Sequence, residues 1–541
     1  MSSSTPSQAD LFKAEGNALF AKKNFKGAHR KYTEALKYDS ENPVLYSNRA
    51  ACSLGLNRYL DASVDATKAT EIDPGYAKAW GRLATAKMGL AAFDKAAEAW
   101  RRALAALPTE KLSPAEKKQR DQYSSELAVA KAKLEEIEAN STQSEGLTII
   151  RSWEKQKLPW ERAIAILPDL AASLTWSSSA WVIERAYRSW ERGVKAMKEF
   201  QIKQTAGGPM MFGRLGAIAE LSNAILEDSR VFHISDENFA SLYNQQMSFE
   251  AMKAKAWVES GPEGVMQEAP KRLEAEGWDA VRPALSITVR GWVVRAFIDD
   301  SLRNSVESAL EFYNCAIDVL KWGAKHWGDV SFEEKGAIFQ PTIARGIKSL
   351  RLGTLMKGCK ENPGKYPYDE LIASADELLA ELGDVPPEPH VPDIAFYLSF
   401  FRYPMGQAHS IRAFAFLRKA EDLRGANGGG LTDDITKLYS KAGMEYLTAA
   451  SCYPKDDLIY PWFLHCAYHA QFNAYATPRF LLSLLDMLEE SIPLMNKIWE
   501  FSPEVVTFRE ALEKDLKSRE DLQYALDTKQ LELDSLILKP F

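Results

Sequence analysis

The chain has 541 residues, more than one hydrophobic core usually serves, so two or more folded units are expected. Hydrophobic residues make up 46% and charged residues 26%, a balance that excludes an intrinsically disordered protein. The net charge is only −7 and neither half has a large basic excess, which argues against a nucleic-acid-binding protein.

The first residues and the overall hydropathy bear on location. Residues 1–8 are mostly small and polar; they lack the basic and apolar regions of a secretory signal, and we expect them to be disordered. No uncharged apolar stretch reaches 18 residues, so no membrane span is predicted. Five scattered cysteines suit neither a disulfide framework nor a zinc ribbon. We therefore expect a protein with free thiols that is either cytosolic or nucleocytoplasmic.

A 34-residue pattern repeats three times from Ala9 onwards, over residues 9–42, 43–76 and 77–110. Each copy places bulky, small and aromatic residues at matching positions of two helices. These residues are Phe12, Gly16, Leu19, Ala28, Tyr32 and Ala35; Tyr46, Ala50, Ala62, Ala66, Ala69 and Pro74; and Trp80, Ala84, Phe93, Ala96, Trp100, Ala103 and Pro108. This period is typical of the tetratricopeptide repeat (TPR), whose helix pairs stack into a solenoid.

The repeat frame directs a set of polar side chains from the first helices into the concave groove. They are Lys13, Asn17, Asn48, Lys78 and Arg82. Both the first two and the last two are four residues apart, which puts each pair on one helix face. Asparagine amides and basic side chains donate hydrogen bonds to carboxylates, so the groove is predicted to bind an acidic peptide, in particular its C-terminus.

These residues resemble the dicarboxylate clamp of TPR co-chaperones, namely the Hop/Sti-type organising proteins and the small glutamine-rich TPR proteins. The matching segments are Lys13-Ala14-Glu15-Gly16-Asn17, Tyr46-Ser47-Asn48-Arg49 and Ala77-Lys78-Ala79-Trp80-Gly81-Arg82. The resemblance covers about the first 140 residues. It implies that the five groove residues hold the Glu-Glu-Val-Asp tail of cytosolic heat-shock chaperones of the seventy- and ninety-kilodalton classes.

The N-terminal region has the charge that such a partner needs. Residues 1–140 hold 22 Lys and Arg against 18 Asp and Glu, a net +4, whereas the remainder holds 45 against 56, a net −11. An amphipathic helix over 115–139 is predicted to cap the repeats, which gives a TPR domain over 9–139. The polar residues 140–146 are predicted to be a linker.

The remaining residues, 147–541, are predicted to form one large helical domain of unknown function. Amphipathic stretches cover 180–204, 238–259, 281–302, 305–327 and 480–499, and no sustained strand pattern occurs, so the chain is predicted to be all-α. The small and aromatic residues of the second repeat helix are echoed by Ala309, Tyr313 and Ala316, and by Ala442, Tyr446 and Ala449. This region is therefore either an irregular α-solenoid or an ordinary helical core.

No common phosphate-binding, hydrolase or metalloprotease motif occurs. The strongest metal candidate, His465-Cys466-x-x-His469, has no acidic ligand near it in sequence, so a packed histidine pair is favoured and no metal or cofactor is expected. Aromatic groups at 396–403 and 460–463 are interpreted as core. The sequence thus predicts a non-enzymatic co-chaperone adaptor, whose C-terminal domain contributes a client or second-partner surface.

Two alternatives remain open. The repeats could be a scaffold for an unrelated protein, bound through an internal helix or loop without a free carboxylate. The C-terminal region could instead be an enzyme of unrecognised type, which would require polar residues that converge in a pocket.

Overall fold

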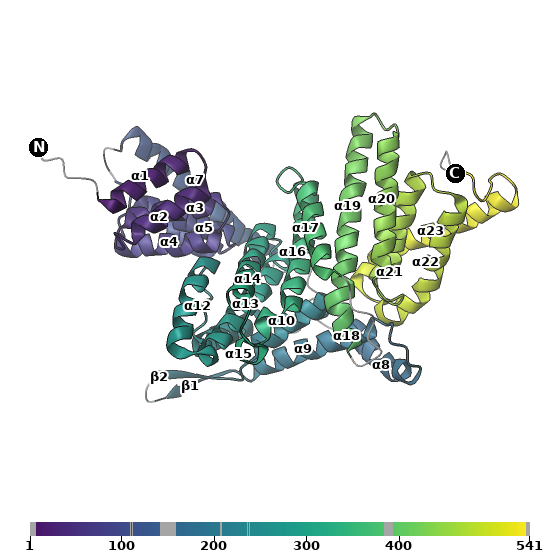
Figure 1. Cartoon of the computed structure of the whole chain (residues 1–541), viewed down its shortest axis with the longest axis horizontal. Helices are drawn as coiled ribbons and strands as arrows, with labels where there is room; N and C mark the ends of the chain where they lie inside the picture. The colour runs from purple at the N-terminus through teal and green to yellow at the C-terminus, as the bar shows by residue number, and fades with distance from the viewer. Residues whose placement is uncertain are drawn as a thin grey trace, which may run out of the picture. The chain divides into compact units, whose positions relative to one another are not determined.

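The computed structural model describes residues 7–108, 110, 112–140, 158–205, 208–234, 236, 238–383 and 393–536 (Figure 1). The chain divides into two units, one of residues 1–147 and 247–339, the other of residues 148–246 and 340–541. The segment 247–339 thus folds with the repeats, although the sequence predicted one domain over 147–541. Residues 1–6 of the expected disordered terminus and 141–146 of the expected linker lie outside the described residues.

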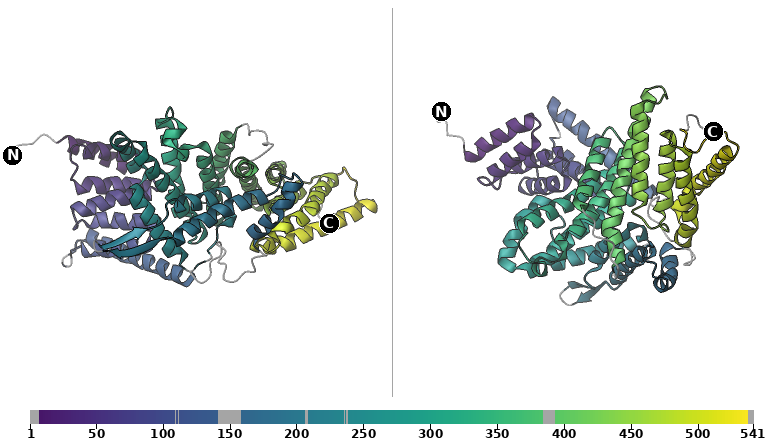
Figure 2. Two further views of the ribbon diagram at one scale, coloured as in Figure 1. Left: turned by 90° about the horizontal axis from the view of Figure 1, so that it is seen from below. Right: turned by 45° about the vertical axis from the view of Figure 1, so that its right-hand side comes forward.

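The first unit begins with three helix pairs and a longer seventh helix, which stack in order (Figure 2). Their bounds are α1 Gln8–Ala21, α2 Phe25–Leu36, α3 Pro43–Gly55, α4 Tyr59–Ile72, α5 Ala77–Gly89, α6 Phe93–Ala105 and α7 Pro114–Asn140. Helices α3 and α5 begin at Pro43 and Ala77, the first residues of the second and third repeats. Helix α7 packs on α6, as a capping helix does.

Small residues allow the repeat helices to approach closely. The alanines at the repeated small positions are fully buried: Ala28, Ala35, Ala50, Ala62, Ala66, Ala69, Ala84, Ala96 and Ala103. At Gly16 a Cβ atom would lie 2.7 Å from Cε1 of Tyr32, so only glycine lets this ring lie against α1. A side chain larger than these at the crossings would force the helices apart.

The same unit contains a second group of helices. They are α11 Phe239–Ala254, which spans the sequence boundary between the units, α12 Pro262–Glu276, α13 Trp278–Ser301, α14 Val306–His326, α15 Phe332–Lys335 and a 3-10 turn, η3 Ala337–Phe339. Helices α13 and α14 pack as a pair, and α12 lies against both. Helix α12 also contacts α4 of the second repeat.

Polar contacts between the repeats and helices α12–α14 form what we term the junction. Helix α4 has no side-chain cap of its own, and the N–H of Leu60 in its first turn donates to Oε1 of Glu311 at 3.0 Å. Arg58 pairs with Glu263 at 2.8 Å, and Arg295 donates to the carbonyl of Leu90, just after α5, at 3.1 Å. Helix-end groups need such partners because they have none within the helix.

Burial at the junction changes the acidity of its side chains. Burial raises the pKa of Glu311 to about 7, although the Leu60 N–H acts in the opposite direction. Burial, followed by the charges of Glu263 and Glu311, raises the pKa of Asp61 well above its usual value. Burial also lowers the pKa of His29 to about 4, so its ring is neutral at pH 7 despite lying 3.4 Å from Glu263. Burial at the junction thus favours the neutral form of these side chains.

The second unit is built of helices and one hairpin. Its elements are α8 Pro159–Ala172, α9 Ala180–Lys198, β1 Gln201–Thr205, β2 Gly208–Phe212, α10 Ala217–Asp228, η2 Ser229–Val231, α16 Pro341–Glu361, α17 Tyr368–Leu382, α18 Ile394–Tyr397, the π-helical turn η4 Leu398–Arg402, α19 Tyr403–Ala426, α20 Asp433–Ala450, α21 Ile459–Asn473, α22 Pro478–Trp499 and α23 Pro503–Asp527. Each of α19, α20, α21 and α22 packs on the next helix in the chain (Figures 1 and 2).

The helix predicted over 180–204 is wrong at its C-terminal end, because α9 ends at Lys198 and a β-hairpin follows it. Strands β1 and β2 pair antiparallel, with Ile202 opposite Met211 and Thr205 opposite Gly208. Every residue of β1 is exposed, so the strand lacks the buried face whose alternation would have revealed it. Gly208 has a φ of +105°, which few other residues adopt.

The all-helical class is otherwise confirmed. The echoed residues Ala309, Tyr313 and Ala316 are buried on α14, and Ala442, Tyr446 and Ala449 are buried on α20. None of the aromatic residues at 396–403 and 460–463 is exposed, in agreement with their interpretation as core. Among the helices that the structure describes, none is both long and apolar enough to cross a lipid bilayer.

Candidate functional site

The first helix of each repeat carries the predicted groove residues. Lys13 and Asn17 lie on α1, Asn48 lies on α3, and Lys78 and Arg82 lie on α5. Helices α3 and α5 contact each other directly. The repeat architecture thus supplies a row of helices that present corresponding positions to one ligand.

Arg82 and Asn48 are in direct contact. Nη1 of Arg82 donates to Oδ1 of Asn48 at 3.2 Å and also to Oγ of Ser47, whose side chain is buried. Burial lowers the pKa of Arg82 from its usual value, and nearby Tyr76 and Tyr123 act in the opposite direction. An arginine remains charged under these conditions, so the guanidinium of Arg82 on α5 is a cation held in place by two residues of α3.

Asn17 is held by Tyr32 from the second helix of its own repeat. The Tyr32 hydroxyl donates to Oδ1 of Asn17 at 2.8 Å. Burial raises the pKa of Tyr32 to about 12, with a further contribution from Cys52, while Arg82 lowers it. Tyr32 therefore stays protonated at pH 7 and can act as the donor. The effect of Arg82 on its pKa also links Tyr32 to the Arg82–Asn48 pair.

These contacts orient both asparagine amides. Oδ1 of Asn17 accepts from Tyr32, and Oδ1 of Asn48 accepts from Arg82. Because each amide oxygen is engaged, the NH₂ group of each amide is the part left to donate to a ligand. Donors so oriented match an anion, and they match a carboxylate better than a peptide carbonyl because charge-assisted hydrogen bonds are stronger.

The two groove lysines lie on α1 and α5, the helices that also carry Asn17 and Arg82. Lys13 lies 3.4 Å from the exposed carboxylate of Asp10, a contact that water screens. Lys78 is exposed and forms no ion pair within the part of the chain that the structure describes. Both ammonium groups can therefore turn towards an acidic ligand without the loss of a strong internal interaction.

Two supporting residues were not predicted as part of the site. Tyr32 was recognised only as a repeat residue that packs, and Ser47 had no assigned role. In the structure the ring of Tyr32 lies against Gly16, the residue before Asn17, and this packing brings the hydroxyl beside Asn17. Arg49, next to Asn48, is turned away and forms a two-bond ion pair with Asp65, with distances of 2.7 and 2.6 Å, which joins α3 to α4.

A separate polar hollow in the second unit bears on the enzyme alternative. It has a volume of about 550 Å³ and lies along α9 and α10, with Arg185, Arg188 and Arg192 in its lining. Arg185 pairs with Glu227 at 2.8 Å, and Arg192 pairs with Glu220 at 2.9 Å. Because these guanidinium groups already have carboxylate partners, the hollow offers less to an anion than the groove does.

Comparison with known proteins gives partial matches. No protein-family model matches the chain. The heat shock protein sti1 homolog of Schizosaccharomyces pombe is 45% identical over 96 residues, which are 18% of this chain and 16% of that protein. The co-chaperone sgt12 of Aspergillus fumigatus is 39% identical over 99 residues, 18% of this chain and 29% of that protein.

Two further matches are similar in extent. The Hsp70-Hsp90 organizing protein of Triticum aestivum is 41% identical over 101 residues, which are 19% of this chain and 17% of that protein. The solved Sgt2 TPR domain from Aspergillus fumigatus is 33% identical and covers 28% of this chain and 96% of that domain, with a TM-score of 0.22. The chain thus spans less than a third of the length of these curated relatives. Within that span, a segment of this chain resembles the TPR domains of Sti1/Hop and Sgt2 co-chaperones.

Proposed function

We propose that the groove of α1, α3 and α5 binds the C-terminus of an acidic peptide, of the Glu-Glu-Val-Asp type that ends cytosolic Hsp70 and Hsp90 chaperones. The observation that carries this proposal is the orientation of the two amides, with Asn17 and Asn48 both left as donors. Asn48 lies beside the fixed guanidinium of Arg82, and oriented amide donors together with such a cation can hold a terminal carboxylate.

Charge supports the same ligand. Lys13 and Lys78 are placed to meet acidic side chains of the peptide, and residues 1–140 carry a net +4. The similarity of this segment to the TPR domains of Hsp70 and Hsp90 co-chaperones adds to the proposal. In this role the chain is a non-enzymatic adaptor in the cytoplasm, with access to the nucleus, and the second unit offers the surface for a client or another partner.

The direct test is calorimetric titration of the full chain with a peptide that ends in Glu-Glu-Val-Asp. Its C-terminally amidated twin should bind at least about tenfold more weakly, because the amide removes the charged terminal group. Lys78→Ala should weaken binding of the free acid, whereas Lys95→Ala, which changes an exposed lysine on α6, should not. The full chain is required because helices 247–339 belong to the same unit as the repeats.

Two outcomes would reject the proposal. If the free-acid peptide does not bind, the groove is not a receptor for such tails. If free acid and amide bind equally well, the groove recognises an internal acidic segment, and the repeats are a scaffold for another kind of partner.

A further inference from the structure

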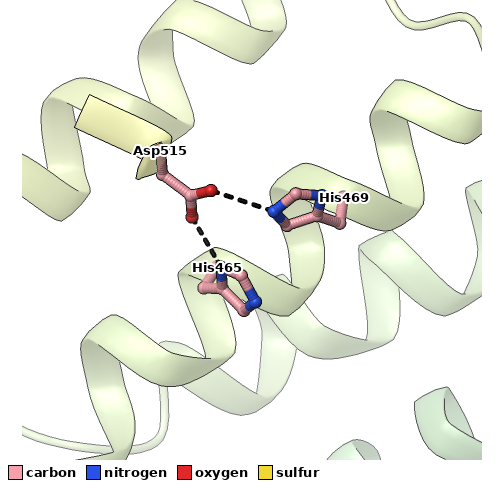
Figure 3. Close-up of side chains that lie close together, drawn as sticks. All are labelled: His465, His469 and Asp515. Carbon is pink, nitrogen blue, oxygen red and sulfur yellow. Dashed lines mark hydrogen bonds and ion pairs between the residues drawn. The ribbon is translucent and has the colours of Figure 1, made fainter. Parts of the chain in front are cut away.

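Three side chains of the second unit meet between α21 and α23 (Figure 3). His465 and His469 lie one turn apart on α21, and Asp515 reaches them from α23. Oδ2 of Asp515 is 2.6 Å from Nδ1 of His465, and Oδ1 is 2.9 Å from Nε2 of His469. Asp515 is 50 and 46 residues from the two histidines in sequence, so the acidic partner that the sequence seemed to lack is supplied by the fold.

The spacing of these atoms suits a small metal ion. One ligand atom from each residue lies within 4.8 Å of the others. In a tetrahedral zinc site with bonds of about 2.0–2.1 Å, ligand atoms are about 3.3 Å apart. Small side-chain rotations of the two histidines and of Asp515 would open the present hydrogen-bonded contacts to that separation.

Burial within the cluster is graded. The side chain of Asp515 is 2% exposed, that of His465 is 16% exposed and that of His469 is 51% exposed. An ion could therefore enter beside His469, and water could occupy a fourth position there. The carboxylate would lie on the interior side, where a positive charge is most needed because a buried anion is costly unless it is paired.

A second histidine–carboxylate pair in the same unit provides an internal comparison. Nδ1 of His409 is 2.7 Å from Oε2 of Glu445, and Oε1 of Glu445 is 3.0 Å from Nη2 of Arg412. Arginine thus neutralises Glu445. In contrast, the ion pairs of Asp515 among the described residues involve only His465 and His469, and no lysine or arginine.

Neighbouring rings hold the two imidazoles in place. Trp462 stacks on His465 with ring centroids 4.8 Å apart, and Tyr468 meets His469 edge-on at 5.1 Å. Because these rings are on the same helix as the histidines, they restrict the two imidazoles to small rotations before any ion binds. The carboxylate is a hard ligand, but imidazole is a borderline one, and a set with two imidazoles suits Zn²⁺ and its neighbours better than Mg²⁺ or Ca²⁺.

We propose that His465, His469 and Asp515 bind one divalent transition-metal ion, for which Zn²⁺ is the natural test, and that the ion links α21 to α23. The site has three protein ligands and an open position on the side of the half-exposed His469. Its predicted effect is to fasten the C-terminal helix α23 to the preceding helices.

The test uses untagged full-length chain, stripped with a chelator and dialysed, and measures Zn²⁺ binding by competition with a chromogenic chelator. One equivalent of Zn²⁺ should bind per chain. His469→Gln and Asp515→Asn should each weaken binding by at least about tenfold, since each removes one of three ligands. His409→Gln should bind Zn²⁺ as the wild type does, and Mg²⁺ should not compete.

Circular dichroism, Co²⁺ spectra and hydrogen exchange distinguish loss of the metal ligand from loss of the fold. His469 is half exposed, so His469→Gln should fold normally even if Asp515→Asn does not; circular dichroism checks both. Co²⁺ should give the intense visible bands of a four-coordinate ion in the wild type and lose them in His469→Gln. Zn²⁺ should also slow hydrogen exchange in α23. The proposal is overturned if the wild type binds no Zn²⁺, or if His469→Gln binds it as tightly as the wild type.

Discussion

The groove and the junction are both polar, both built on the TPR helices, and opposite in character. The groove presents cations and amide donors, and two of its lysines have no strong internal partner. The junction buries carboxyl groups: Glu311 accepts from the Leu60 N–H, whereas Oδ2 of Asp61 is buried without a hydrogen-bond partner among the described residues. Donors without an internal partner indicate a ligand from outside, whereas the internal contacts of Glu311 and Glu263 indicate packing within the chain. Changes in the groove should therefore affect binding, and changes in the junction should affect stability.

The largest loss of stability is expected from Gly261→Ala at the junction. A Cβ at Gly261 would lie 1.8 Å from Oδ1 and 2.9 Å from the backbone nitrogen of Asp61, so α12 could not keep its place against α4. Because the overlap is severe, we expect a loss of about 3 kcal/mol in the stability of this contact, the upper end of the usual range for overpacking. Hydrogen exchange of peptides from α4 and α12 measures it.

The matched control is Gly264→Ala on the same helix, where the nearest atom to a new Cβ is Ser260 Cβ at 3.3 Å. The Gly264→Ala substitution should change the hydrogen exchange of α4 and α12 only slightly. If Gly261→Ala folds but also loses the acidic peptide, the groove and the junction are not separate, and the comparison fails.

The next largest effect is on the pH dependence of the stability of the folded chain. Glu311 has a pKa of about 7 in the folded chain against an ordinary 4.5, so the folded chain binds more protons between these values. Its contribution to stability is thus fully present below about pH 4.5 and is lost as pH rises through 7, by about 3 kcal/mol at most. His29, with a folded pKa of about 4, acts in the opposite direction between pH 6.5 and 4.

Glu311→Gln separates these two contributions. The difference in α4 hydrogen exchange between wild type and variant should shift in favour of the variant as pH rises from 5 to 7.5. Glutamine keeps an acceptor for the Leu60 N–H, so a pH-independent difference would show that the carboxyl group does not titrate in this range. Peptide affinity should be the same for both proteins at each pH.

A smaller effect, confined to binding, is expected from Arg82→Ala. It removes the guanidinium and also frees the amide of Asn48, so affinity for the acidic peptide should fall by about 1–3 kcal/mol. Arg102→Ala, an exposed arginine on α6 that pairs with Glu98, is the matched control and should bind normally. Calorimetry measures both, and α4 exchange should stay unchanged.

The smallest effect is expected from Tyr32→Phe. Phenylalanine keeps the ring against Gly16 and removes only the hydroxyl that orients Asn17. Affinity should fall by about 1 kcal/mol, the usual contribution of one hydrogen bond. Wild-type affinity in this variant would mean that Asn17 needs no orientation, which would weaken the main support for the clamp.

The 34-residue repeat explains which parts of the candidate site could be predicted from the sequence. Asn48 and Arg82 are 34 residues apart, one repeat, so their place on neighbouring helices follows from the period alone. The hairpin was missed because strand β1 has no buried face. The partners Leu60 and Glu311 are 251 residues apart, and His465 and Asp515 are 50 apart, with no repeat to relate them. Such contacts depend on how helices pack, which residue spacing does not encode.

The hydrogen bond from the Leu60 N–H to Glu311, which caps α4, can form only late in the synthesis of the chain. The two residues are 251 positions apart, and a ribosome adds about 5–20 residues per second, so Leu60 is synthesised roughly 10–50 s before its acceptor. During that interval the nascent repeats have their groove residues but lack the helices that cover α4. The newly made chain therefore carries all five groove residues before its own first unit is complete.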